Sequence, residues 1–340
     1  MENHDVDRGR WITDVAPYLG PLRSVVDDFE ARTGVAVDLP AALFLRAQLA
    51  GFRLPGRTSA GGSCRLLETA DGWAAVNLAR PDDHASLPAL LALLGARDAD
   101  LAGAARRTTA SRLAGTAQTL GIAAAALAAA RSRRCPVRTR SCGERRHRPL
   151  AGLRVLDLSA LWAGPLCAKL LGLAGAHVTK VESTVRPDGA RRGDPRFYRW
   201  LHEGHDSVVL DFASGALVEA VDRADIVIEA SRPRALRRLG VKAEEFLSAR
   251  PGRVWAGLTG YGRDDDRIAF GDDAAVAGGL VGRDAHGDPV FLGDALADPA
   301  TGLFAAHAVV RSLAAGGGEL LCVSMAASAA LLAGSGTVPC

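Results

Sequence analysis

Three carboxylates in two segments of this 340-residue chain could do chemistry. Asp298 is followed by Pro299 and an apolar run, LADPATGLFAAHAV, while Asp272 and Asp273 stand together in GDDAAVAGG. Carboxylates at such places can act as nucleophiles or as bases. The local pattern alone favours a structural role, with Asp298 as a helix N-cap, Pro299 as the first helical residue, and the pair starting another helix. Both roles can share one location, because helix-start amides keep a carboxylate ionised.

A short glycine loop, SAGGS, supplies a different kind of chemical group. Gly61 and Gly62 are flanked by Ser59 and Ser63, and a strand-like segment, Trp73–Leu78, follows. Glycine lets the backbone approach a reacting centre closely and leaves amide N–H groups free to stabilise an oxyanion. Because GGS is also a common flexible turn, the loop by itself does not identify a site.

The stretch from Leu150 to Glu182 predicts the elements that would hold such groups. Its pattern predicts a strand, a break at Gly164-Pro165, a helix and a second strand, which indicates a parallel βαβ unit. Units of this kind bind ligands at the carboxyl ends of their strands, where helix-start amides can receive an anion. Here those ends are Trp162 to Pro165 and Glu182 to Ser183.

The wider pattern predicts an α/β protein with two unequal parts. Residues 1–130 read as a smaller, mainly helical α+β domain that contains the glycine loop, and the alanine-rich run 108–130 is expected to be a helix. Residues 131–149 read as an arginine-rich linker, and residues 150–340 as a Rossmann-like, doubly wound parallel sheet. The expected strands of that sheet are Arg154–Leu158, His177–Glu182, Ser207–Phe212, Ile226–Ala230, Val254–Thr259 and Leu320–Ser324.

Composition argues against several other classes of protein. A net charge of +3 with only three tyrosines and nine phenylalanines gives no support for nucleic-acid binding. The cluster of eight arginines between Arg131 and Arg148 is therefore read as a solvated, mobile linker, with a nucleic-acid patch or an arm on an acidic partner as alternatives. The run 114–130 is too short and too weakly apolar to span a membrane. Six cysteines without a CxxC pair favour the reducing cytoplasm and give no metal site.

Read in order, five blocks of the second half resemble the family III CoA-transferases. They are GLRVLDLSALWAGPLCAKLLGLAGAHVTKVES, DSVVLDF, ADIVIEASRPRALRRLG, PGRVWAGLTGYG and LADPATGLFAAHAVVRSL. The resemblance implies a domain that binds coenzyme A and moves it from an acyl-CoA to a carboxylic acid acceptor. It also implies that Asp298 is the nucleophile, forming a covalent aspartyl-CoA thioester. No metal is implied.

The first half has a counterpart in the same family, in an unexpected place. SAGGSCRLLETADGWAAVNLARPDDHASLPALLALLG resembles the small domain that normally follows the CoA domain. The chain therefore looks circularly permuted, which is physically tolerable because termini often lie close together on a surface. The resemblance also implies that Gly61 and Gly62 form the loop over the reactive aspartate. This loop has fewer glycines than the richest ones of the family.

Matching positions also imply the coenzyme A contacts. Arginines among them could pair with phosphates through two parallel hydrogen bonds. Trp162 and Ser183 stand where better-known members carry a polar and a basic residue. The implied contacts are Trp162, Gly164, Pro165, Glu182, Ser183, Arg191, Ala230, Ser231 and Arg232.

Two other functions stay open beside CoA transfer. The racemase branch of the family carries a His-Asp pair where this chain has Asp272 and Asp273, so proton exchange on a 2-methylacyl-CoA is one alternative. A non-catalytic CoA-binding or scaffold protein is the other. The family often forms interlocked dimers, and we expect a homodimer here, with a linker long enough to cross a partner.

Overall fold

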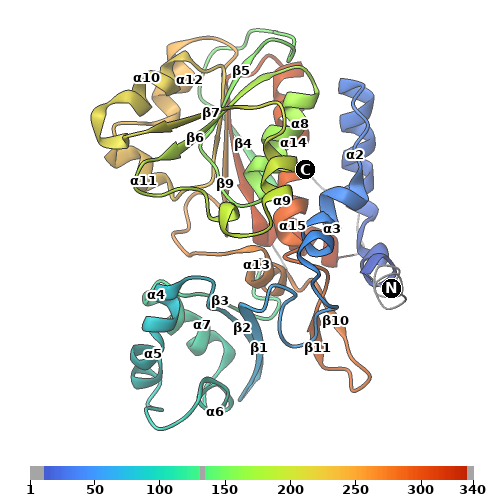
Figure 1. Ribbon diagram of the computed structural model, residues 1–340, viewed down its shortest axis with the longest axis vertical. Helices are drawn as coiled ribbons and strands as arrows, with labels where there is room; N and C mark the ends of the chain where they lie inside the picture. Colours follow the sequence, from blue (N-terminus) through green and yellow to red (C-terminus); the bar gives the residue numbers. More distant parts are fainter. Residues whose placement is uncertain (1–10, 131–134, 335–340) are drawn as a thin grey trace.

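The computed structural model describes residues 11–130 and 135–334, and the first four residues of the predicted linker lie outside this range. Within it, seven strands form the main sheet in the order β4-β12-β9-β8-β5-β6-β7 (Figure 1). All neighbours are parallel except β4, which pairs antiparallel with β12. The strands are β4 (Val137–Ser141), β5 (Arg154–Asp157), β6 (His177–Ser183), β7 (Asp206–Leu210), β8 (Ile226–Glu229), β9 (Val254–Thr259) and β12 (Glu319–Ser324). The predicted α/β class is confirmed, and the six predicted strands lie within about two residues of their expected bounds.

Helices cover both faces of this sheet, because successive residues of its central strands are buried on opposite sides. Val155, Ile228 and Ala256 belong to one apolar core, and Leu156, Val227 and Trp255 belong to the other. The second core holds α10 (Ala216–Arg223), α11 (Pro233–Arg238) and α12 (Ala243–Ala249). The first holds α8 (Ala163–Leu173), α9 (Pro195–His202), α13 (Gly271–Gly278), α14 (Ala297–Ala314) and α15 (Met325–Ala333). Short 3-10 turns lie at η1 (Ala16–Tyr18), η2 (Gly189–Arg192) and η3 (Phe212–Ser214).

The first two helices of the chain pack on the main sheet's domain and not on the small sheet. They are α2 (Gly20–Thr33) and α3 (Leu39–Ala50), and Figure 1 shows both beside α14, away from β1 to β3. Leu22, Val26 and Phe29 of α2 and Phe44 of α3 join the core that contains α14. The packing boundary therefore does not coincide with the predicted division at residue 130.

The arginine-rich segment also contributes to the sheet. The reading as a mobile linker is wrong for Val137–Ser141, because these residues pair with β12 from Val137 opposite Val323 to Ser141 opposite Glu319. The side chains of β4 are mostly exposed, so the strand is held by its backbone pairing rather than by an apolar face. Because β4 has no buried apolar face, its hydrophobic pattern does not predict a strand.

The glycine loop lies directly before the first strand of a separate three-stranded antiparallel sheet. Its strands are β1 (Cys64–Thr69), β2 (Gly72–Asn77) and β3 (Ala123–Ala126), with α4 (Pro81–Ala85), α5 (Leu87–Leu93), α6 (Leu101–Arg106) and α7 (Ala110–Thr119) around it. The predicted helix over 108–130 is wrong beyond Thr119. Gly121 has a φ of +76°, and the four alanines of β3 pair with β2, so tertiary pairing overrides the helix propensity of alanine.

A two-stranded ribbon and α13 connect the two parts. The ribbon is β10 (Val281–Arg283) with β11 (Pro289–Phe291). Phe291 and Val276 pack with Cys64 and Leu66 of β1 in one apolar cluster. In the described part of the chain, no helix is both long enough and apolar enough to cross a bilayer.

Candidate active site

Asp298 lies in the first turn of α14 without capping it. The helix begins at Ala297, its N-cap residue is Leu296, and no side chain caps it. The N-cap prediction for Asp298 is therefore wrong. The tight turn before the helix, in which Ala295 has a φ of 46° and accepts a 2.8 Å hydrogen bond from the Asp298 amide, starts the helix earlier than the Asp-Pro pattern predicts. Asp298 is half-buried as a residue, and its carboxylate accepts a hydrogen bond from the Gly271 amide.

Two more carboxylates and one arginine surround Asp298, and we call these four residues the reaction cluster: Arg46, Asp272, Asp294 and Asp298. The pKa of Asp298 is raised to about 7: burial is the main cause, the nearby Asp272 and Asp294 carboxylates add to the rise, and Arg46 opposes it. Burial also raises the pKa of Asp272 to about 6. A carboxylate that changes charge near neutral pH is suited to nucleophilic or acid-base work.

Arg46 comes from α3 and is fixed in the reaction cluster on two sides. Its Nε donates to Asp294 Oδ2 at 2.7 Å, its Nη2 donates to Asp294 Oδ1, and Asp294 is completely buried. The guanidinium group also lies over the Trp162 ring, 4.9 Å from its centroid. The cluster thereby joins the N-terminal helices to the first turn of the βαβ unit.

The glycine loop reaches this cluster through Gly61. A Cβ at Gly61 would lie 3.9 Å from Arg46 Nη2, and the buried Ser59 side chain hydrogen-bonds to Asp272. Gly62 is exposed and has a φ of +81°, and a Cβ there would meet nothing within 4 Å. The structure thus places Gly61 beside Arg46 of the reaction cluster and Asp272 near Asp298, and Gly62 shapes the turn next to Gly61.

Asp273 points away from the reaction cluster, toward β2. It caps α13 by accepting from the Phe270 amide at 3.0 Å, and it accepts from Asn77 Nδ2 at 3.0 Å. The helix-start reading is therefore confirmed for Asp273. The other two oxygens of this pair, Asp273 Oδ2 and Asn77 Oδ1, are buried without a hydrogen-bond partner. Burial raises the pKa of Asp273 to about 7.

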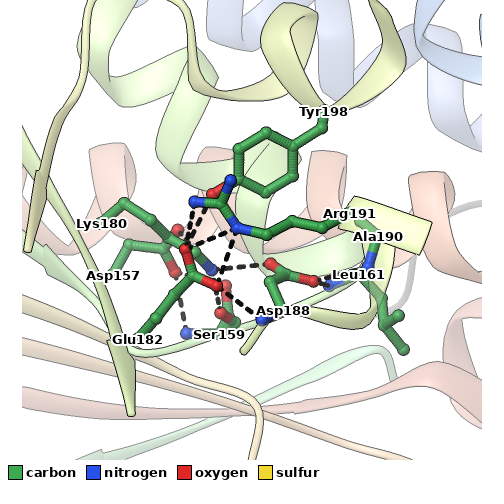
Figure 2. A network of polar contacts seen from close by, with 9 residues as sticks. All are labelled: Asp157, Ser159, Leu161, Lys180, Glu182, Asp188, Ala190, Arg191 and Tyr198. Carbon is green, nitrogen blue, oxygen red and sulfur yellow. Dashed lines mark hydrogen bonds and ion pairs between the residues drawn. The ribbon is translucent and has the colours of Figure 1, made fainter. Parts of the chain in front are cut away.

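At the carboxyl ends of β5 and β6, a polar network holds the predicted binding turn (Figure 2). Lys180 is buried, donates to the Ser159 carbonyl, and pairs with Asp188 Oδ2 at 2.9 Å and Asp157 Oδ2 at 3.8 Å. Asp188 Oδ1 accepts from the Leu161 amide at 2.9 Å. Because Leu161 has a φ of 72°, this bond stabilises a backbone conformation that leucine rarely adopts.

Arg191, a predicted phosphate contact, is engaged in the same network. Its Nε and Nη2 donate to Glu182 Oε1 at 3.0 and 2.5 Å, and its guanidinium group lies 4.2 Å from the centroid of the Tyr198 ring. Tyr198 donates to the same Glu182 oxygen at 3.0 Å. The Arg191 guanidinium beside it lowers the pKa of Glu182 to about 2. Glu182 therefore orients Arg191 and stays ionised.

The other predicted contacts fall into three environments. Trp162 is 1% exposed and packs edge-on against Phe197 at 5.2 Å, so it shapes the turn from beneath. Gly164 has no room for a side chain, because a Cβ would lie 2.1 Å from Ser159 Oγ, and Pro165 is buried beside it.

The predicted contacts at the ends of β8 and β6 are more open. Ala230 and Arg232 are exposed at the end of β8, and Ser231 donates to the buried Glu229 at 3.2 Å. Ser183 is half-buried at the end of β6.

An open cavity of about 600 Å³ lies beside the network, along α9 and the start of β7. Lys180, Arg191 and Arg199 line it with His202 and His205, whose ring nitrogens are buried without hydrogen-bond partners. Burial lowers the pKa of His202 to about 4. Glu203 and Asp206 line it as well, so the cavity carries charges of both signs next to the predicted binding turn.

Four residues of the reaction cluster and the polar network were not predicted from the sequence. Lys180 stands inside the first segment that carries the resemblance, and Asp188 follows that segment by five residues. A lysine within a β-prone apolar run, in a chain with only three lysines, was a usable signal. Asp294 precedes Asp298 by four residues in GDALAD. Arg46 gave no signal, because it lies in an ordinary apolar helix and reaches the site only through the fold.

The model of CoA-transferase family III matches residues 150–338, which is more than half of the chain. The chain belongs to CoA-transferase family III. Among curated members, it is 35% identical over 182 residues to the succinyl-CoA–L-malate CoA-transferase beta subunit of Chloroflexus aurantiacus, covering 48% of this chain and 45% of that protein. It is 34% identical over 186 residues to the probable fatty acyl-CoA transferase Rv3272 of Mycobacterium tuberculosis, covering 49% and 46%. This family III member thus spans about half the length of the curated relatives it matches.

A solved structure agrees with this assignment. The crystal structure of Rv3272 from Mycobacterium tuberculosis superposes with a TM-score of 0.50 at 30% identity and covers 55% of this family III chain and 56% of that one. The likeness therefore extends to the fold as well as to the sequence over about half of each chain.

Proposed function

We propose that this family III protein is an acyl-CoA:carboxylate CoA-transferase that works through a covalent aspartyl-CoA thioester on Asp298. The observation that carries the proposal is the environment of Asp298. Its side chain makes no cap on α14, the residue is not fully buried, and burial raises the pKa of its carboxyl to about 7. Such a carboxylate can be a nucleophile at neutral pH and can leave again from an anhydride.

The proposed cycle conserves one negative charge. A carboxylate oxygen of Asp298 attacks the thioester carbonyl, the C–S bond breaks, and a mixed anhydride and CoA thiolate result. The thiolate attacks the Asp298 acyl carbon, so a C–S bond forms, the C–O bond breaks, and the first acid leaves as its carboxylate. The acceptor carboxylate then attacks this thioester, and the released thiolate attacks the acceptor's acyl carbon, which regenerates Asp298.

Coenzyme A would bind across the carboxyl ends of β5, β6 and β8. The six parallel strands run β7-β6-β5-β8-β9-β12, the 3-2-1-4-5-6 order of Rossmann folds, whose ligand crevice lies between the first and fourth strands. Those two strands are β5 and β8, which end at the Trp162 turn and at Ala230 to Arg232. Amides at the start of α8 and the cations of the adjoining cavity support binding of the nucleotide phosphates there.

The order of the two parts supports a circular permutation of the family's usual arrangement. The family match begins at residue 150, after the glycine loop and the small sheet. A homodimer and a cytoplasmic location stay predictions, which gel filtration and localisation of a tagged protein would test.

Trapping of the intermediate tests the proposed function. The protein is incubated with a panel of acyl-CoAs that begins with succinyl-CoA, named in several relatives, and is then treated with hydroxylamine or borohydride and mapped by mass spectrometry. We expect a modified Asp298 peptide and transfer to an added acid. Asp298→Asn should lose both by about three orders of magnitude or more, while Asp27→Asn, an exposed carboxylate on α2, should keep them. Transfer that survives in Asp298→Asn would reject the proposal.

One observation favours testing proton exchange as a second function. Asp272 is buried beside Asp298, and its pKa of about 6 suits an acid-base group. Incubation in deuterated water with a 2-methylacyl-CoA and no acceptor acid distinguishes the two reactions. Deuterium at the α-carbon without an Asp298 adduct would identify a racemase.

A further inference from the structure

Arg46 is the cation of the reaction cluster. Three carboxylates, Asp272, Asp294 and Asp298, lie near it, and its guanidinium group is attracted to each of them. It acts more strongly on Asp298 than either neighbouring carboxylate does. These charged groups reach Asp298 from three places in the fold: α3, the start of α13, and the turn before α14.

The position of the guanidinium group is determined by more than attraction to charge. The paired hydrogen bonds to Asp294 fix its plane, and the Trp162 ring covers it at 4.9 Å. Phe52 contributes a second ring, 5.9 Å from the guanidinium carbon. A planar cation held between a buried carboxylate and aromatic rings keeps its direction while the substrate changes.

The proposed reaction moves a negative charge through a site that already holds two other carboxylates. Every step places the charge on Asp298, on the CoA thiolate or on the substrate acid. Without a fixed cation, Asp272 and Asp294 would repel each of these species. A fixed positive charge next to this region lowers the free energy of the negatively charged species in every step, and the cation does not have to move to do so.

We infer that Arg46 is the positioning residue of the reaction cluster: held by Asp294 and Trp162, its guanidinium group stabilises the negative charge on Asp298 and on the species that replace it. This inference rests on the proposed function for its kinetic consequence. The effect on the charge of Asp298 holds whether or not the protein transfers CoA.

The experiment compares two variants that both lack the buried Asp294 charge. Removal of Arg46 alone would leave Asp294 buried and unpaired and could prevent folding. Asp294→Asn is therefore compared with Arg46→Gln/Asp294→Asn, which differ only at Arg46. Arg23→Gln, at an exposed arginine on α2, is the matched control for loss of a positive charge.

The first measurement needs no activity. The side-chain carboxyl carbon of aspartate is labelled for NMR, and the Asp298 resonance is identified by its loss in Asp298→Asn. We expect its titration midpoint to lie about one pH unit higher in the double variant than in Asp294→Asn, and to be unchanged in Arg23→Gln. Equal midpoints in two folded variants would overturn the inference.

The second measurement is kinetic. Transfer by the double variant should have a kcat about ten- to a hundredfold below that of Asp294→Asn, with a smaller change in KM. Full activity of the double variant would show that Arg46 only compensates the Asp294 charge, which would also overturn the inference. If the wild-type protein forms no adduct on Asp298, the proposed function fails, and the NMR midpoints still decide the role of Arg46.

Discussion

Two groups of acidic residues lie at neighbouring places in the fold and behave in opposite ways. In the reaction cluster, three carboxylates share the single cation Arg46. In the network of Figure 2, three carboxylates share two cations, Lys180 and Arg191, and also accept from backbone amides. The pKa of Glu182 there falls to about 2, whereas that of Asp298 rises to about 7.

The difference shows that the number of cations and N–H donors around a carboxylate decides whether it keeps its charge. Where cations and N–H donors match the carboxylates, the charges stay fixed and the backbone between them is held in one conformation. Where carboxylates outnumber cations, at least one of them is poised to change charge. The network therefore keeps its charges fixed, whereas the reaction cluster holds a carboxylate that can change charge near neutral pH, as the proposed function requires.

The largest expected effect comes from breaking the network at its centre. Lys180→Met should destabilise the protein by about 3–5 kcal/mol, because Asp188 and Asp157 lose the ammonium group that pairs with them. Urea unfolding measures the change. Asp298→Asn, which removes charge from the acid-rich cluster, should cost nothing or stabilise. If both variants lost equal stability, the contrast between the two regions would be wrong.

A smaller effect should appear in the pH dependence of stability, with opposite signs for the two regions. The folded pKa of Glu182 is below its ordinary value of 4.5, so its stabilisation is present above pH 4.5 and is lost as the pH falls toward 2. The folded pKa of Asp298 is above 3.8, so stability falls as the pH rises from about 4 to 7.

Paired unfolding curves measure these slopes. The free energy of unfolding of the wild type, relative to that of Glu182→Gln, should fall by about 2 kcal/mol as the pH drops from 4.5 to 2. Relative to that of Asp298→Asn, it should fall as the pH rises from about 4 to 7. The half-exposed Arg191 side chain keeps the first value modest, because solvent screens its charge. Slopes of the same sign would contradict the contrast.

The two regions also differ in how far the sequence predicts them. The binding turn is local: Leu150 to Glu182 encodes its strands and helix by periodicity, and its glycine and proline mark the turn. The reaction cluster is assembled from distant segments, so Asp298 and Gly61 were proposed only through the resemblance, and Arg46 was not found. Strand β4 and strand β3 were missed for a related reason, since backbone pairing forms them where hydrophobic pattern or alanine propensity predicts something else.

Asp273 gives the smallest expected effect and tests where the boundary of the reaction cluster lies. It stands next to Asp272 in sequence, yet its bonds to Asn77 and Phe270 make it part of the link between α13 and β2. If its carboxyl is protonated, Asp273→Asn substitutes one neutral group for another of similar shape, and the amide oxygen can still accept from Asn77 and Phe270. We expect a stability change below about 1 kcal/mol at pH 6 and little change in transfer. A loss of several kcal/mol, or of activity comparable to that in Asp298→Asn, would show that Asp273 is ionised and belongs with the reactive carboxylates.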